Sequence, residues 1–219
     1  MDDDFGRLFH LYDSLAERSA AAPTFDPRYT DTISGFWFLG RDRESRRVVH
    51  IQAVGLINLG NQTLAEYLSD RAWLYHPYGE DVSPEHCSFP ASGASQIKGQ
   101  VCYQGELWVR PGKEGFQGLR LAQQLVRFAI VLSESMFTPD FMWAFVSERN
   151  ARVKFPQRSG YQHTEADGVI WRNAAQAVQL REWLVWADRP NLMDLAAQER
   201  DAHVLRPVAQ DHENRTAVR

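Results

Sequence analysis

Apolar and polar positions recur with two periodicities along this chain, one typical of helices and the other typical of strands. The first helical repeat consists of Leu8, Leu11, Tyr12 and Leu15. This repeat predicts a helix over Phe5–Ala22, and the aspartates at positions 2 to 4 would stabilise its N-terminal end through the helix dipole. Prolines at positions 23 and 27 would end the helix.

Strand-like runs, rich in aromatic and β-branched residues, follow along the rest of the chain. They lie at Ile33–Leu39, Val48–Leu59, Ile97–Val109, Phe141–Val146, Tyr161–Arg172 and Leu180–Trp186. The first two are separated by a short charged segment, which predicts a hairpin. The last run fits a helix as well, but its Trp and Val content favours a strand.

Further helices are predicted where apolar residues recur at helical spacing. They are Gln62–Tyr75 with Asn61 as its cap, Leu119–Met136, a short helix at Arg152–Gln157, and Asn191–His203. The segment His76–Ser95 is rich in Pro, Gly and Ser and is predicted to be a loop.

The order of these elements predicts one α/β (α+β) domain over residues 1–206, followed by a polar, flexible tail at 207–219. A chain of 219 residues is in the usual range for a single domain. The segment Ile97–Val146 reads strand, glycine-containing loop, helix, strand. This is a βαβ crossover, which makes its two strands parallel.

Composition and charge exclude several classes of protein. No apolar run reaches the roughly 18–20 residues of a membrane span. The chain begins Met-Asp-Asp-Asp, unlike a secretory signal, and has two cysteines, so a cytoplasmic protein outside the membrane is expected. The net charge of −4 argues against nucleic acid as a partner.

The segment Val109–Leu121 carries the strongest chemical signal in the sequence. Gly112, Gly115 and Gly118 lie within seven residues between a strand and the most regular helix. Such a loop exposes backbone N–H groups at a helix N-terminus and can bind an anion. A plain turn would explain one glycine but not three. The loop has neither the Gly-Lys-Ser/Thr ending of a Walker loop nor the paired glycines of a dinucleotide site.

This loop resembles the pyrophosphate loop of the GNAT N-acetyltransferase superfamily, whose pattern is Arg/Gln, two residues, Gly, one residue, Gly/Ala, then a Leu-rich helix. With Gly118 as the last small residue, Lys113 takes the basic position and Phe116 stands where the pattern has a glycine. A second resemblance follows the next strand, where Asn150 leads a short helix that ends at Gly160-Tyr161. In element order the resemblance extends from residue 33 to residue 189.

The resemblance implies a splayed mixed sheet that holds acyl-CoA between two parallel strands. It also implies direct attack of an unidentified amine on the thioester of acetyl-CoA, and it calls for no metal. The implied cofactor-binding residues are Leu107, Val109, Lys113, Glu114, Gly115, Phe116, Gln117, Gly118, Leu119, Arg120 and Asn150.

Three side chains are candidates for proton transfer in such a reaction. Glu106 lies late in its strand, where the amine should arrive, although it could equally be a solvent-facing carboxylate. Ser147 and Glu148 lie at the end of the strand Phe141–Val146. Many GNAT proteins place a tyrosine in the short helix, whereas this chain has Phe155 there. Tyr161 is expected to be a core residue.

Other polar and aromatic residues give no specific indication of a functional site. The histidines at 76 and 86 and the cysteine at 87 share a loop but lack the spacing of a zinc site, and nothing indicates an activated Cys102. Aromatic groups around Trp37 and Trp73 fit either the core or an acceptor pocket.

Two other functions stay open. The chain could be a GNAT-fold acyl-CoA-binding or interaction module without catalysis, or it could transfer a longer acyl group. The helix Gln62–Tyr75, which a minimal family member lacks, would either shape the acceptor site or form a homodimer contact.

Overall fold

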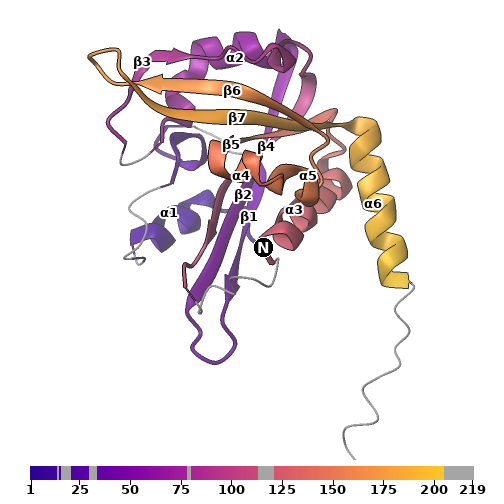
Figure 1. Ribbon diagram of the computed structural model, residues 1–219. Coiled ribbons are helices and arrows are strands. Elements are labelled where there is room, and N and C mark those ends of the chain that lie inside the picture. Colours follow the sequence, from indigo (N-terminus) through magenta and orange to yellow (C-terminus); the bar gives the residue numbers. More distant parts are fainter. Residues whose placement is uncertain (14, 16–20, 30–33, 78–79, 113–120, 205–219) are drawn as a thin grey trace, which may run out of the picture.

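The computed structural model describes residues 1–13, 15, 21–29, 34–77, 80–112 and 121–204, and Figure 1 shows their arrangement. A mixed seven-stranded sheet with the order β1-β2-β4-β5-β7-β6-β3 runs through the described part of the chain, with helices on both faces. The predicted fold class, a splayed mixed sheet flanked by helices, is therefore confirmed.

One half of the sheet is antiparallel and begins with the predicted hairpin. It consists of β1 (Gly35–Arg41), β2 (Val48–Thr63) and β4 (Lys98–Val109). In Figure 1 this half forms the long vertical part of the molecule, with the hairpin turn at the bottom.

The centre of the sheet is the predicted βαβ crossover. Helix α3 (Leu121–Phe137) connects β4 to β5 (Phe141–Ser147), and the two strands are parallel. Their ladder covers only three residue pairs, from Val101–Phe141 to Tyr103–Trp143. Beyond Tyr103 the two strands diverge, and this divergence creates the cavity described below.

The other half of the sheet is antiparallel again and includes one strand that we did not predict. It consists of β7 (Val178–Asp188), β6 (His163–Arg172) and β3 (Ser83–Ser88). The predicted strand at Leu180–Trp186 is confirmed as part of β7. Strand β3 lies in the segment expected to be a loop. Its sequence, SPEHCS, has no apolar alternation, and it is ordered by pairing with β6 at the sheet edge.

The helices differ from prediction mainly at their ends. Helix α1 (Phe5–Asp13) is shorter than expected, and α2 (Leu64–Arg71) is followed by a 3₁₀ turn at Ala72–Tyr75. The cap of α2 is Thr63 rather than Asn61, because the hydroxyl of Thr63 and the carboxylate of Glu66 form a reciprocal capping box. The predicted short helix is two helices, α4 (Glu148–Arg152) and α5 (Phe155–Ser159), and the last helix is α6 (Arg189–Val204).

Apolar side chains pack in two clusters, one on each face of the sheet. On one face Leu8 and Tyr12 of α1 pack over the sheet with Tyr103 and Trp143. On the other face Val126, Ala129 and Ile130 of α3 pack over the sheet with residues that include Phe36 and Met142. Figure 1 shows α1 and α3 on opposite sides of the β1-β2-β4 strands. We call these the α1 face and the α3 face. No helix among the described residues is long and apolar enough to span a membrane.

Candidate functional site

A cavity of about 300 Å³ lies where β4 and β5 diverge. Its walls come from β4, β5, β7, α3 and the short helices after β5. The lining residues are Tyr103, Gln104, Gly105, Glu106, Leu107, Val126, Ala144, Phe145, Val146, Ser147, Asn150, Phe155, Pro156, Tyr161 and Glu182. The lining includes residues of both apolar clusters, so the cavity has walls on both faces of the sheet.

A β-bulge in β4 shapes one wall of this cavity. Ala53 of β2 pairs with Gly105 and Ile51 pairs with Trp108, so one residue of β2 faces two residues of β4. Glu106 sits in this bulge with φ of 56°, in the left-handed region. A Cβ added at Gly105 would touch the ring of Phe25, and the Glu106 carboxylate bonds to α1, so both positions point to the α1 face.

Glu106 anchors the N-terminal segment to the sheet. The hydroxyl of Tyr12 on α1 donates a hydrogen bond of 2.5 Å to one carboxylate oxygen, and the backbone N–H of Ala22 donates one of 2.7 Å to the other. The expectation of a solvent-facing strand carboxylate is wrong, because Glu106 is half-buried. Glu106 lines the cavity, but both of its oxygens are engaged by the N-terminal segment.

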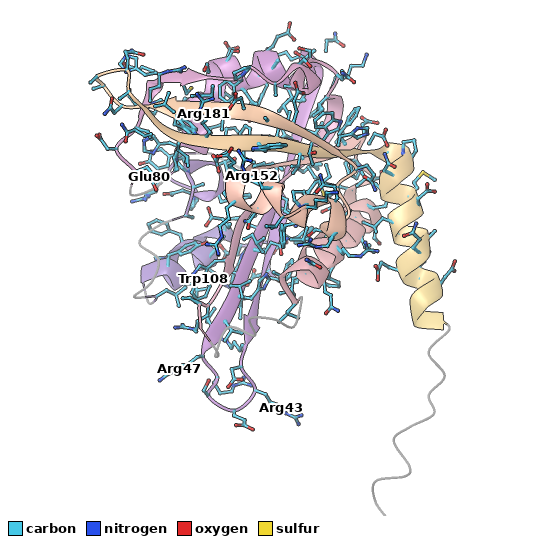
Figure 2. All side chains as sticks on the ribbon, in the orientation of Figure 1. Arg43, Arg47, Glu80, Trp108, Arg152 and Arg181 are labelled. Atoms are coloured by element: carbon cyan, nitrogen blue, oxygen red, sulfur yellow. The ribbon has the colours of Figure 1, made fainter. Side chains whose placement is uncertain are left out.

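Glu182 is the functional candidate that the sequence analysis missed. It lies on β7 directly opposite Ser147 of β5 and reaches the cavity. The pKa of its carboxyl is raised to about 7, mainly by burial; the indole N–H of Trp171 opposes this shift, and the negative charge of Glu80 adds to it. Figure 2 labels Glu80 and Trp108 on the left of the molecule, on the side of α1.

A signal for Glu182 was present in the strand pattern. In a strand, alternate side chains share a face, and Glu182 falls in phase with Leu180, Leu184 and Trp186. All three of these pack in the α1-face cluster. A carboxylate on the apolar face of a buried strand needs an explanation, and the cavity supplies one.

The pKa of the Tyr103 phenol responds to the charges of both Glu106 and Glu182. Burial is the main cause that raises the pKa of its phenol, and the negative charges of Glu182 and Glu106 raise it further. The phenol therefore stays protonated. Tyr103, Glu106 and Glu182 all line the cavity, and the charges of both carboxylates contribute to the pKa of this one phenol.

The α3-face side of the cavity is lined by a buried polar pair. The hydroxyl of Tyr161 donates a short hydrogen bond to Oε1 of Gln104, and Nε2 of Gln104 donates to the carbonyl of Val126 on α3 at 3.5 Å. Tyr161 is 2% exposed and packs in the α3-face cluster, as expected of a core residue, although it also lines the cavity. Burial raises the pKa of Tyr161 well above its usual value.

The structure separates the two catalytic candidates at the end of β5. Ser147 lines the cavity, where its hydroxyl caps α4 by accepting a hydrogen bond from the N–H of Asn150 at 3.4 Å. Glu148 is not among the cavity-lining residues and forms an ion pair of 2.6 Å with Arg152 at the surface. Figure 2 labels Arg152 beside α4. Phe155 lines the cavity, so an apolar ring occupies the place where the resemblance led us to look for a hydroxyl.

The predicted cofactor-binding residues fall in two groups. Leu107, Val109 and Asn150 are described. The two β4 residues lie beyond the point where the ladder to β5 ends, and Leu107 and Asn150 line the cavity. The predicted pyrophosphate loop from Lys113 to Arg120 lies outside the described residues.

Other polar groups set aside from the sequence are buried or dispersed. Burial raises the pKa of the Cys102 thiol to about 12, which disfavours a nucleophilic thiolate. Burial lowers the pKa of His50 to about 4, so this imidazole is neutral. Within the described ranges, no group of three or more His, Cys, Asp or Glu side chains could hold a metal ion.

Neither a protein-family model nor a curated protein sequence matches the chain. Among solved structures, the chain is similar to Arabidopsis thaliana NAA60 in complex with acetyl-CoA, with 12% identity, coverage of 84% of this chain and 93% of that chain, and a TM-score of 0.46. It is also similar to the aminoglycoside acetyltransferase AAC(6')-Ib in complex with coenzyme A and kanamycin, with 11% identity, coverage of 89% and 95%, and a TM-score of 0.45. A third is the spermidine N-acetyltransferase of Vibrio cholerae in complex with CoA and spermine, with 10% identity, coverage of 88% and 79%, and a TM-score of 0.42. Similarity at this level concerns the fold and does not identify a reaction.

Proposed function

We propose that this chain is an acyl-CoA-dependent N-acyltransferase that transfers an acyl group, in the simplest case acetyl, to an amine by direct attack. The observation that carries this proposal is the divergence of the parallel strands β4 and β5 over a cavity lined by carboxylates. Such a split gives a thioester and an amine access to one another from the two faces of the sheet.

The backbone of β4 suits the acyl-CoA side of this cavity. After Tyr103, β4 is no longer paired with β5, and we propose that acyl-CoA binds along this edge of β4. Peptide N–H groups fixed by a strand stabilise the oxyanion of acyl transfer without reorganising. Asn150, in the first of the short helices, lines the cavity, which supports a contact with the arm of acyl-CoA. We propose that the pyrophosphate is bound by residues Lys113 to Arg120.

The contribution of the cavity is mainly to hold two reactants together. The direct route requires the amine nitrogen to attack the thioester carbon, and holding both in one cavity removes the entropic cost of their encounter. The leaving thiolate needs little assistance, because an ordinary thiol has a pKa of about 8.5. Phe155 in the lining is therefore compatible with catalysis.

The same Phe155 is the observation that favours a second candidate, an acyl-CoA-binding module without catalysis. Both candidates bind acetyl-CoA, but only the enzyme releases free CoA thiol when it is offered an amine. Calorimetry with acetyl-CoA followed by a thiol-release assay over a panel of amines distinguishes them. Binding without turnover on any amine would favour the module.

The substitution Gly118→Glu tests the proposed pyrophosphate site. A carboxylate at the proposed pyrophosphate position should abolish acetyl-CoA binding, since it brings both a Cβ and a negative charge. Gln124→Glu is the matched control, because it places the same charge on the exposed surface of α3. Unchanged affinity in a folded Gly118→Glu protein would contradict the site assignment.

A further inference from the structure

We propose that the acceptor enters the α1 face of the cavity as an ammonium ion, that Glu106 and Glu182 together attract it, and that Glu182 removes its proton. This inference rests on the proposed function and names the chemical class of its acceptor. It assigns different roles to the two carboxylates and gives Glu182 the catalytic one.

The first argument is the placement of the two carboxylates. Both line the same cavity, one from β4 and the other from β7, and the charge of each reaches the phenol of Tyr103. The strands that carry them lie on either side of β5 in the sheet. Two carboxylates that line one cavity attract a cation that binds in it, and the attraction is stronger where the surroundings are partly buried.

The second argument is the aromatic wall behind the carboxylates. Tyr103 and Trp143 have ring centroids 4.5 Å apart, and Trp143 and Phe145 have centroids 5.3 Å apart. Of these rings, Tyr103 and Phe145 line the cavity, and Trp143 packs behind them. Aromatic faces attract ammonium groups, and an apolar wall strengthens the attraction between opposite charges.

The roles of the two carboxylates differ because their surroundings differ. Glu106 accepts hydrogen bonds from Tyr12 and from the backbone of Ala22, so it is a fixed negative charge that also orders the N-terminal segment. Glu182 sits among apolar groups, and burial raises its pKa to about 7. A base with a pKa near the operating pH is the effective proton acceptor.

The proton balance of the step is as follows. The ammonium gives one proton to the carboxylate of Glu182 and becomes a neutral amine. The nitrogen lone pair forms a bond to the thioester carbonyl carbon, and the carbon–sulfur bond breaks as the tetrahedral intermediate collapses. The second nitrogen proton goes to the leaving thiolate. The products are an amide and CoA thiol, and Glu182 then releases its proton to water.

The binding part of this inference is tested without turnover. The probes are benzylamine and n-butylamine, each compared with its alcohol, and binding is measured by calorimetry in the presence of CoA. We expect each amine to bind at least tenfold more tightly than its alcohol at pH 8, and Glu182→Gln and Glu106→Gln each to reduce this preference. Glu85→Gln on the exposed side of β3 is the control and should keep it. Equal affinity for amines and alcohols in the wild type would overturn the inference.

The catalytic part is tested by the pH profile of turnover. Wild-type kcat/KM should rise with pH through about 7 as Glu182 ionises. Glu182→Gln should lower kcat by about 10²–10⁴-fold, remove that rise and leave the acetyl-CoA affinity unchanged. Glu106→Gln should raise the KM of the amine and keep the rise with pH. An unaltered pH profile in Glu182→Gln would overturn the role of Glu182. If the wild-type protein does not bind acetyl-CoA, the proposed function itself is contradicted.

Discussion

The hydroxyl of Tyr12 on α1 donates a hydrogen bond of 2.5 Å to Glu106 on β4, a residue 94 positions later in the chain. Together with the bond from Ala22, this contact ties the N-terminal segment to the wall of the cavity. The first helix of the chain is thereby part of the candidate site.

Replacing this tyrosine separates its role in stability from any role in cofactor binding. Tyr12→Phe should lower the free energy of unfolding by about 1.5–3 kcal/mol, the range for a hydrogen bond to a charged group. The KM of the amine should rise because the segment is less well ordered, while acetyl-CoA affinity should not change. Urea unfolding and calorimetry measure these effects. The exposed Tyr29→Phe is the control, and an equal loss of stability there would contradict the role given to Tyr12.

Glu182 should make the protein less stable as the pH rises. The folded state holds the pKa of this carboxyl at about 7, against its ordinary value of 4.5, so between these values the folded protein binds more protons than the unfolded chain. Stability is then lost as the pH rises from about 4.5 to 7. Glu182→Gln should remove this loss and stabilise the protein at pH 8 by at most about 3 kcal/mol, since the shift sets the upper limit. Thermal unfolding at pH 5 and pH 8 measures the difference, and a variant less stable at pH 8 would count against the inward placement.

His50 should make the protein less stable as the pH falls, over a pH range that overlaps the range in which Glu182 acts. Its pKa is about 4 in the folded state, below the ordinary value of 6.5, because burial disfavours the charged imidazole. The unfolded chain therefore takes up the proton first, and stability is lost as the pH falls from about 6.5 to 4. His50→Gln should flatten this part of the stability curve, whereas the exposed His10→Gln should not. Chemical unfolding between pH 4 and 7 tests the prediction, and an unchanged slope in His50→Gln would refute it.

Phe155 offers a test of how much help the leaving group needs. Phe155→Tyr adds a hydroxyl to the cavity lining. If proximity and backbone hydrogen bonds supply most of the rate enhancement, kcat should change by less than about tenfold. Thiol release with a working amine, measured across pH, decides the matter. A wild type without turnover that this substitution activates would support the binding-module alternative.

The strand and helix pattern predicted most of the sheet, because runs of apolar residues dominate β1, β2, β4, β5 and β7. It could not predict β3, since that edge strand is stabilised by backbone pairing with β6. The cap of α2 was misplaced by two residues because two polar residues near the helix start could both serve, and only Thr63 has Glu66 three positions later.

Prediction of the site was limited in the same way, because the sequence does not show which strands pair. Glu106 and Ser147 were predicted from their places late in a strand or at its end, and Asn150 from the resemblance to the GNAT short helix; all three line the cavity. Glu148 was named for the same reason, but one position further along the chain it turns to Arg152 at the surface. The strand alternation places Glu182 on an apolar face, but the residues that it meets there depend on the pairing of β7 with β5, which no local pattern shows.

The bulge at Glu106 means that the number of residues in β4, as well as their identity, decides which side chains face α1. On a regular strand, a residue between Gly105 and Leu107 would point away from the α1 face, because successive side chains alternate. The extra residue lets a carboxylate join that face while Leu107 keeps its contact with the α3-face cluster. A deletion of one residue here would leave a regular strand and an intact sheet without the carboxylate. In a lineage of such proteins, acceptor recognition would therefore be gained or lost by single-codon insertions and deletions, a kind of change that substitution counts do not register.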